Sequence, residues 1–190
     1  MAEQLQGKVV VVTGGSSGIG RATSMAFARE GAKVIVSDVN VNGGQETVGM
    51  VKEQGGEARF VKADVSQAVE VKALVDEAVD TYGRLDCGFN NAWGLGKPPD
   101  AEAINSFLVP PHECEEDVWD QTIDICLKGV WLCMKYEIQQ MLKQGGGTIV
   151  NTASALGLVG LKGHSIPYIA AKHGVIGLTK TGALEYSAQG

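Results

Sequence analysis

Short apolar runs alternate along the chain with longer amphipathic segments. The runs predict strands, and the β-branched runs at residues 8–13 and 33–38 are typical of strands buried on both faces. Five strands are expected over residues 8–13, 33–38, 59–63, 85–89 and 148–152. Apolar positions at helical spacing predict helices over residues 19–30, 42–54, 67–82, 115–143 and 165–188.

This alternation predicts repeated strand–helix–strand units with right-handed crossovers. We therefore expect an α/β fold, a three-layer doubly wound parallel sheet of the Rossmann type. The chain of 190 residues is expected to form one domain over residues 1–190. The stretch 90–113 is rich in glycine and proline and long for a connection, and loops of that length are usually functional or mobile.

Composition narrows the class of partner. The net charge is −6, which argues against nucleic acid or an anionic membrane as a partner. No apolar run is long enough to span a bilayer, and the first residues lack a secretory signal core. Cys87, Cys126 and Cys133 have apolar neighbours and are expected to be buried thiols. A cytoplasmic protein without a metal site is the resulting expectation.

The first strand is followed by a glycine-rich turn that opens a helix. Its residues are Thr13-Gly14-Gly15-Ser16-Ser17-Gly18-Ile19-Gly20. Glycines allow the backbone to approach a pyrophosphate, and the helix N-terminus offers unpaired N–H groups and a partial positive charge. The position of the turn, after a strand and before a helix, is what distinguishes a dinucleotide site from an ordinary tight loop.

Asp38 ends the second predicted strand, where a carboxylate can accept hydrogen bonds from both adenosine ribose hydroxyls. It would repel a 2′-phosphate, and the residues that follow, Val39 and Asn40, are not basic. The sequence thus favours NAD over NADP. The alternative is that Asp38 only caps its loop.

Tyr168 and Lys172 lie four residues apart on a predicted helix, so their side chains share a face. A phenol ordinarily ionises far above neutral pH, and a neighbouring ammonium favours the phenolate. Ser154 could hydrogen-bond the same substrate oxygen. The pair could also be two surface residues on an amphipathic helix, since a tyrosine and a lysine at this spacing are a weak signal by themselves.

The turn spacing G-x-x-x-G-x-G, Asn90-Asn91-Ala92, Ser154 and Tyr168-x-x-x-Lys172 together closely resemble the short-chain dehydrogenase/reductase family. The resemblance covers the chain from about Leu5 and implies NAD(P)-dependent hydride transfer between alcohols and carbonyls. It implies that Tyr168 is the acid–base residue, Ser154 polarises the substrate carbonyl and Lys172 binds the nicotinamide ribose. The cofactor-binding residues that it implies are Gly14, Ser16, Ser17, Gly18, Ile19, Gly20, Asp38, Asp64, Val65, Asn90, Ala92, Tyr168 and Lys172.

The expected function is hydride transfer between NAD(H) and an alcohol or ketone. The alternative is a non-catalytic NAD-binding or assembly protein derived from the same family. The resemblance also implies a homodimer or homotetramer through the helices at 115–143 and 165–188. Apolar residues that could serve such a contact, or face only the sheet, are Val130, Trp131, Met134, Val175, Ile176 and Leu178.

The chain departs from the family pattern in three places. Cys126 occupies the position of a family asparagine whose backbone, in a local helix distortion, helps seat a proton-relay water. Trp93 replaces a glycine, and the loop 93–113 is longer than usual, so we expect it to cover the mouth of the active site. His164 and Ser165 could reach the pocket, although a lone loop histidine is more often incidental.

The third departure is that the chain ends at Gly190, where the family normally continues through further strands and a final helix. An unpaired sheet edge beside the fifth strand is therefore expected. A fragment of a longer protein, an edge covered by another subunit and a naturally reduced form are all compatible with this sequence.

Overall fold

Five parallel strands form the sheet of the computed structural model, which describes residues 4–94 and 108–190. The strands are β1 (Val9–Thr13), β2 (Lys33–Asp38), β3 (Glu57–Lys62), β4 (Cys87–Asn90) and β5 (Thr148–Asn151). Their order across the sheet is β3-β2-β1-β4-β5. All four neighbouring pairs are parallel. The chain therefore reverses its direction of travel between β1 and β4, which confirms the predicted doubly wound fold.

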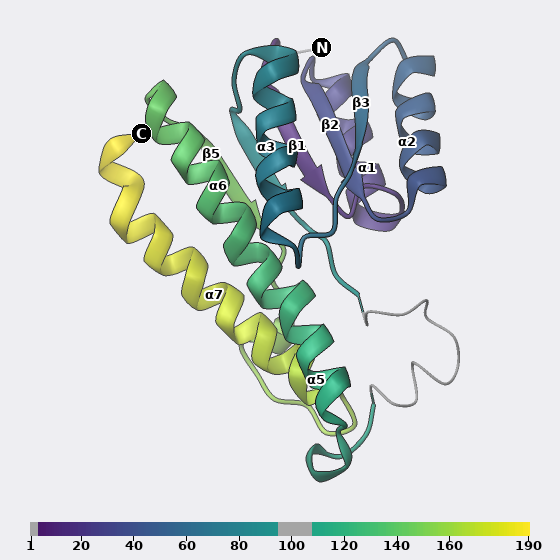
Figure 1. Ribbon diagram of the computed structural model, residues 1–190, viewed down its shortest axis with the longest axis vertical. Helices are drawn as coiled ribbons and strands as arrows, with labels where there is room; N and C mark the ends of the chain where they lie inside the picture. The colour runs from purple at the N-terminus through teal and green to yellow at the C-terminus, as the bar shows by residue number, and fades with distance from the viewer. Residues whose placement is uncertain (1–3, 95–107) are drawn as a thin grey trace.

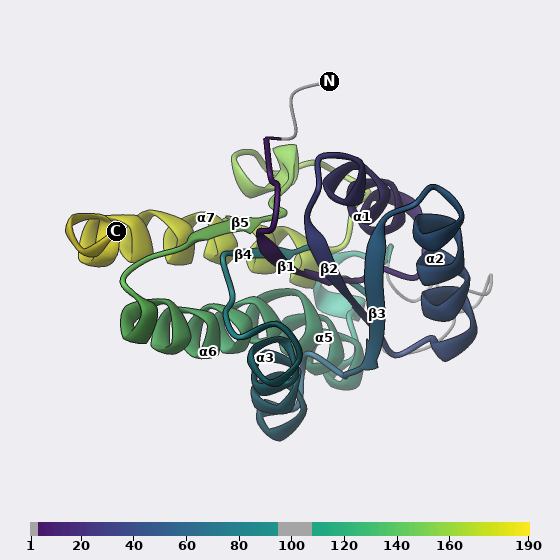
Figure 2. The same cartoon turned by 90° about the horizontal axis from the view of Figure 1, so that it is seen from above.

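Helices cover both faces of this sheet (Figure 2). On one face lie α1 (Gly18–Arg29) and α2 (Val41–Glu53), and on the other lie α3 (Ala68–Tyr82) and α6 (Gly129–Gln144). The last long helix, α7 (Ile166–Tyr186), runs beside α6 (Figure 1). In the described part of the chain, no helix combines the length and the apolar character needed to cross a membrane.

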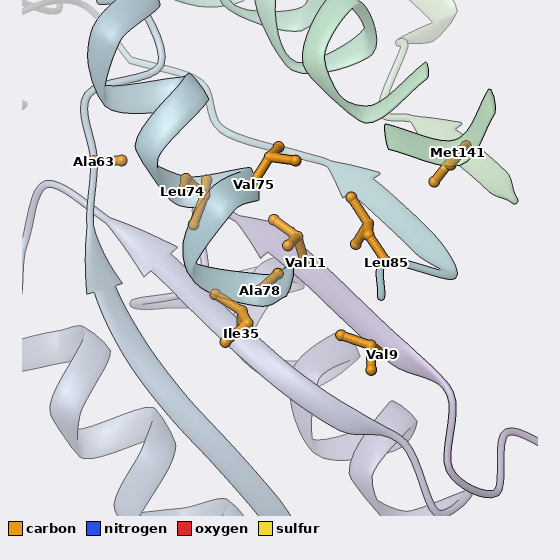
Figure 3. Close-up of a cluster of buried hydrophobic side chains, with 9 residues drawn as sticks. All are labelled: Val9, Val11, Ile35, Ala63, Leu74, Val75, Ala78, Leu85 and Met141. Atoms are coloured by element: carbon orange, nitrogen blue, oxygen red, sulfur yellow. The ribbon is translucent and has the colours of Figure 1, made fainter. Parts of the chain in front are cut away.

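The four valines of β1 explain why this strand is central. Val9 and Val11 belong to the buried cluster with Leu74 and Val75 of α3 (Figure 3). The alternate residues, Val10 and Val12, belong to a second cluster on the side of α1 and α2. Because successive side chains of a strand point to opposite faces, an unbroken apolar run contributes to both cores at once.

A smaller cluster joins α6, α7 and β5. It contains Val130, Met134 and Val175, all of which are buried within the chain. Of the two expected roles for these three residues, a subunit contact or packing within the chain, the structure shows the second, because they fill the chain's own core. Trp131 of α6, by contrast, is 46% exposed.

The single helix expected over residues 115–143 is divided into three parts. Helix α5 (Glu116–Ile123) is followed by a π-helical turn, Asp124–Lys128, and then by α6. One wide turn leaves the apolar period of the segments on either side intact, so the sequence pattern does not reveal it. Cys126 lies at the centre of the π turn and is fully buried.

Strand β4 begins later than the apolar pattern predicts. Leu85 is buried, but its N–H donates to the Gln144 side chain at 3.1 Å, and its carbonyl accepts from the same amide at 2.5 Å. Leu85 is thereby paired with the end of α6 instead of with a neighbouring strand. Apolar character identifies a buried position, and the hydrogen-bond partner decides whether that position belongs to the ladder.

The outer side of β5 faces an apolar pocket of about 200 Å³ between α6 and α7. Residues of both helices and of the strand line it, among them Met134, Ile138, Ile149, Thr179 and Ala183. Strand β5 is the last in the order of the sheet and pairs with β4. Among the described residues β5 is therefore an edge strand, as expected.

Candidate active site

The glycines of the first turn are required for different reasons. Gly14 and Gly18 have φ angles of 68° and 51°, which favour residues without a Cβ. A Cβ on Gly20 would overlap the carbonyl oxygen of Gly14, so the first turn of α1 lies directly on the loop. A Cβ on Gly14 would come within 2.9 Å of the Cα of Ala92, so the turn also touches the loop after β4.

The N-terminus of α1 is open to an anion. Ser17 is its N-cap, but its side chain makes no capping hydrogen bond, and the first turn carries no acidic residue. The space where a Cβ on Gly18 would lie is free of atoms within 4 Å, and Ile19 is 63% exposed. Unpaired N–H groups at the positive end of a helix, beside open space, fit the pyrophosphate of a dinucleotide.

Side chains from α1 and α2 hold this turn in place. The guanidinium of Arg21 donates to the carbonyl of Ser16 at 2.6 Å and to Thr47 at 3.0 Å. Thr47 in turn donates to the carbonyl of Gly15 at 2.9 Å. The glycine-rich motif does not identify Arg21 or Thr47. These two side chains connect α1, α2 and the turn, and no local sequence pattern predicts such contacts.

Asp38 is fixed at the carboxyl end of β2, next to the turn. One carboxylate oxygen accepts the N–H of Ser16 at 3.0 Å, and the other accepts the N–H of Asn40 at 2.9 Å. Two backbone donors orient the carboxylate, and it remains partly exposed. This placement suits the predicted contact with a ribose.

Asp64 and Val65 follow β3, as expected, and each has a structural partner. The carboxylate of Asp64 accepts the N–H of Ser66 at 2.9 Å. Val65 is buried and packs against α6, where a Cβ on Gly129 would come within 2.7 Å of its side chain. Their predicted role beside the adenine stays a prediction.

The loop after β4 is tied to the end of β1 through Thr13. Its hydroxyl oxygen accepts the N–H groups of Asn91 at 3.0 Å and Ala92 at 3.2 Å. The side chain of Asn90 points elsewhere and donates to Glu137 of α6 at 2.9 Å. The predicted groove residues are therefore adjacent to the glycine turn. The side-chain amide of Asn90, however, is hydrogen-bonded to α6 and does not face that turn.

Lys172 connects α7 to the end of β5. It is 2% exposed, and its ammonium donates to the carbonyl of Thr152 at 2.6 Å. The same nitrogen lies 5.5 Å from the ring centroid of Tyr168. Burial lowers the pKa of Lys172, because the charged form loses water. A cation is thereby held beside the tyrosine ring.

Tyr168 and Ser154 occupy the starts of neighbouring helical segments. Ser165, the N-cap of α7, accepts the N–H of Tyr168 at 3.4 Å. Ser154 caps the short 3₁₀ turn Ala155–Gly157 and accepts the N–H of Leu156 at 3.2 Å. The Ser154 hydroxyl hydrogen can still be donated to a substrate oxygen. His164 is exposed, whereas Ser165 serves as the helix cap.

Cys126 and Trp93, two of the departures from the family pattern, lie close to these residues. The thiol of Cys126 donates to the carbonyl of Gly94 at 3.9 Å. Burial raises the pKa of Cys126, so the group is a neutral thiol near neutral pH. The indole of Trp93 meets the Tyr168 ring edge-on, with 6.4 Å between centroids. Most of the extended loop, residues 95–107, lies outside the described residues.

The motif residues gather at the carboxyl ends of the parallel strands, where sheets of this type bind their ligands. A glycine-rich turn with an uncapped helix N-terminus follows β1, and the carboxylate of Asp38, held by two backbone N–H groups, ends β2. A buried lysine beside a tyrosine adjoins the end of β5. This arrangement is typical of oxidoreductases that use a nicotinamide dinucleotide.

The chain belongs to the short chain dehydrogenase family, whose sequence pattern matches residues 8–190. It is 42% identical to the cyclohexanol dehydrogenase of Acinetobacter sp. (strain SE19), over 100% of this chain and 71% of that protein. It is also 42% identical to a 2,5-dichloro-2,5-cyclohexadiene-1,4-diol dehydrogenase of Sphingobium indicum, over 98% of this chain and 69% of that protein. The crystal structure of levodione reductase matches with a TM-score of 0.88 and 37% identity, over 97% of this chain and 68% of that one.

Family membership makes this protein an oxidoreductase that interconverts alcohols and ketones with a nicotinamide nucleotide. None of these similarities supports the alternative of a non-catalytic assembly protein. The glycine turn fits such a cofactor, because the N-terminus of α1 has no side-chain cap or acidic residue and the space beside Gly18 is free.

Proposed function

We propose that the protein is an NAD-dependent dehydrogenase or reductase that acts on secondary alcohols or ketones of carbocyclic rings. The observation that carries the proposal is the contact of Lys172 with both the Thr152 carbonyl and the Tyr168 ring. That contact joins the helix with the acid–base pair to the strand end that leads into Ser154. Tyr168, Lys172 and Ser154 must lie close together if they are to act on a single substrate oxygen during proton transfer.

In oxidation, Tyr168 as a phenolate accepts the hydroxyl proton of the alcohol. The buried ammonium of Lys172 stabilises that phenolate, since a nearby cation favours the anionic form. Ser154 donates a hydrogen bond to the substrate oxygen as negative charge develops on it. In reduction, Tyr168 returns the proton to the same oxygen. When bound, NAD supplies the hydride acceptor for oxidation, and NADH supplies the donor for reduction.

The preference for NAD rests on Asp38. Its carboxylate is held by two backbone N–H groups at the end of β2, so it cannot easily turn away from a 2′-phosphate. A dianionic phosphate beside this carboxylate would be repelled. Neither Val39 nor Asn40 offers a cation to offset that repulsion.

The ring preference draws on the two curated relatives with 42% identity, which are named for cyclohexanol and for a cyclohexadiene diol. Both names denote a hydroxyl on a six-membered carbocycle. The proposal transfers this class of substrate to the present chain.

Assembly through α6 and α7 is proposed as well. The exposed indole of Trp131 on α6 is a large apolar side chain that a partner subunit would cover. Light scattering on the purified protein should give at least twice the mass of one chain, and the mass of a single chain would contradict the proposal.

The catalytic proposal is tested by following NADH formation with cyclohexanol. Tyr168→Phe removes the acid–base hydroxyl and keeps the ring, so kcat should fall by about a hundredfold to ten-thousandfold. NAD affinity, measured by calorimetry, should change little. Tyr186→Phe on the same helix removes a partly exposed hydroxyl 18 residues further along and serves as the matched control. A Tyr168→Phe variant with most of the wild-type rate would contradict the assignment.

A further inference from the structure

Trp93 is fixed from both sides in the loop after β4. The N–H of Ala92, one residue before it, donates to Thr13 at 3.2 Å. The carbonyl of Gly94, one residue after it, accepts from the Cys126 thiol at 3.9 Å. Among the described residues, every φ angle in the left-handed region belongs to a glycine, so the tryptophan causes no backbone strain here.

The two departures from the family pattern are therefore connected. Cys126 sits in the π turn and bonds to the residue that follows Trp93. The thiol donor thus helps position the loop that presents the indole. The backbone on either side of Trp93 is therefore held by hydrogen bonds, to Thr13 before it and to Cys126 after it.

The indole lies at the catalytic tyrosine and remains largely uncovered. Its ring plane makes an angle of 73° with the Tyr168 ring at a centroid distance of 6.4 Å, an edge-on arrangement typical of aromatic pairs. Even with this contact, 61% of Trp93 is exposed. A rigid apolar surface of this kind, next to the group that moves the proton, is suited to cover part of a ligand.

We propose that Trp93 is a specificity-determining residue whose exposed indole packs against the carbon ring of a cyclic secondary alcohol while Tyr168 exchanges a proton with the hydroxyl of that alcohol. The proposal rests on the proposed function, because it takes Tyr168 as the acid–base group. It adds the residue that selects the substrate class.

A ring suits this surface better than an open chain for two reasons. The face of a saturated six-membered ring presents several C–H groups at once to a flat indole, and that contact removes apolar area from water. A ring also has few internal rotations to lose on binding, whereas an open-chain alcohol must immobilise several. Contact with the indole should therefore stabilise the binding of a rigid ring more than that of a flexible chain with the same number of carbons.

The test compares the kcat/KM values for cyclohexanol and for hexan-2-ol, a secondary alcohol of equal carbon number, in wild type and variants. Wild type should show the higher kcat/KM for cyclohexanol. Trp93→Gly should lower the ratio of the two kcat/KM values about tenfold, mainly through KM for cyclohexanol. Trp93→Phe keeps an aromatic face and should retain most of the ratio. Trp119→Leu, at an exposed indole on α5, is the control for general loss of a tryptophan.

The outcomes separate this proposal from the one on which it rests. An unchanged ratio in Trp93→Gly, with wild type active on both alcohols, overturns the role of Trp93 and leaves the function of the enzyme standing. Tighter NAD binding by Trp93→Gly, with equal gains on both alcohols, also overturns it, because the indole would then obstruct the cofactor. Wild type inactive on both alcohols would instead overturn the proposed ring-alcohol function, and the role of Trp93 with it.

Discussion

The amide of Asn90 donates to the carboxyl group of Glu137 at 2.9 Å, within the layer between β4 and α6. Asn90 also donates to the side-chain oxygen of Asn151 on β5 at 3.0 Å. Glu137 is 1% exposed, and burial raises its pKa from 4.5 to about 7, although the hydrogen bond from Asn90 opposes the shift. A titrating carboxyl group thus lies under the strands that lead to the active site.

The position of Glu137 predicts that stability falls as pH rises. Between about pH 4.5 and pH 7 the folded chain holds the Glu137 proton more firmly than the unfolded chain does. Stability therefore decreases through this window, by an amount on the order of 3 kcal/mol. The thiol of Cys87, whose pKa is raised to about 11, stays neutral throughout.

Urea unfolding of wild type and Glu137→Gln at about pH 5 and about pH 8 measures this effect. The glutamine keeps an acceptor for Asn90 and cannot ionise, so the variant should lose less stability across the interval. At the higher pH it should be the more stable protein. Equal losses in the two proteins would show that Glu137 does not contribute to the pH dependence.

Gly88 on β4 should be intolerant of any side chain, because a Cβ there would overlap the Glu137 carboxyl group. Gly88→Ala is expected to lower the free energy of unfolding by about 1–3 kcal/mol, the usual result of overpacking a core. Removing the obstructing group in Gly88→Ala/Glu137→Ala should recover part of that loss. A double-mutant cycle in urea measures the coupling, and strictly additive losses would contradict the steric explanation.

Periodicity was sufficient to predict this fold, because β1 and β2 contain the unbroken apolar runs Val9–Val12 and Val34–Val36 and the helices keep their apolar spacing. The apolar period did not reveal the π turn at Asp124–Lys128, because the turn alters hydrogen bonding without altering the period; only the family resemblance implied a helix distortion at Cys126. The start of β4 was misplaced because Leu85 bonds to Gln144 of α6. Both errors concern which backbone groups pair, and apolar patterning carries no information on that choice.

The sequence predicted which motif residues come together at the candidate site. It did not predict the residues that support them. Lys172 and Tyr168 lie together as their spacing indicates. Arg21 and Glu137 were overlooked, because their partners Ser16 and Asn90 are recognised only once the chain is folded. A glutamate within the apolar face of a helix was the one available sign of Glu137.

Gly20→Ala should damage the cofactor turn, because the added methyl group would overlap the Gly14 carbonyl. We expect NAD affinity, measured by calorimetry, to fall at least about tenfold as the turn is displaced. Gly49→Ala is the matched control, since it lies inside α2 with no atom within 4 Å of the new Cβ. It should raise stability by about 0.5–1 kcal/mol through helix propensity and leave NAD affinity unchanged. Equal affinities in both variants would contradict the steric role of Gly20.

Cys126→Asn tests whether the thiol limits turnover. The π turn already sets the backbone geometry at this position. If that backbone geometry, and not the side chain, supports the proton relay, an asparagine that restores the family residue should leave kcat within about threefold of wild type. Cys126→Val removes the donor to Gly94 at similar size and should weaken the placement of Trp93. A loss confined to Cys126→Val supports a positioning role of the side chain, and a large gain in Cys126→Asn would show that the thiol impairs proton relay.

Asp38→Asn separates charge from hydrogen bonding in cofactor selection. The amide oxygen can still accept one of the two N–H groups, from Ser16 or Asn40, while the negative charge is removed. Without repulsion of the 2′-phosphate, the ratio of kcat/KM for NAD to that for NADP should fall by about tenfold or more. Asp38→Ala removes both acceptor and charge, so it should lower affinity for NAD as well as discrimination. A ratio that is the same in wild type and Asp38→Asn would show that this carboxylate does not select the cofactor.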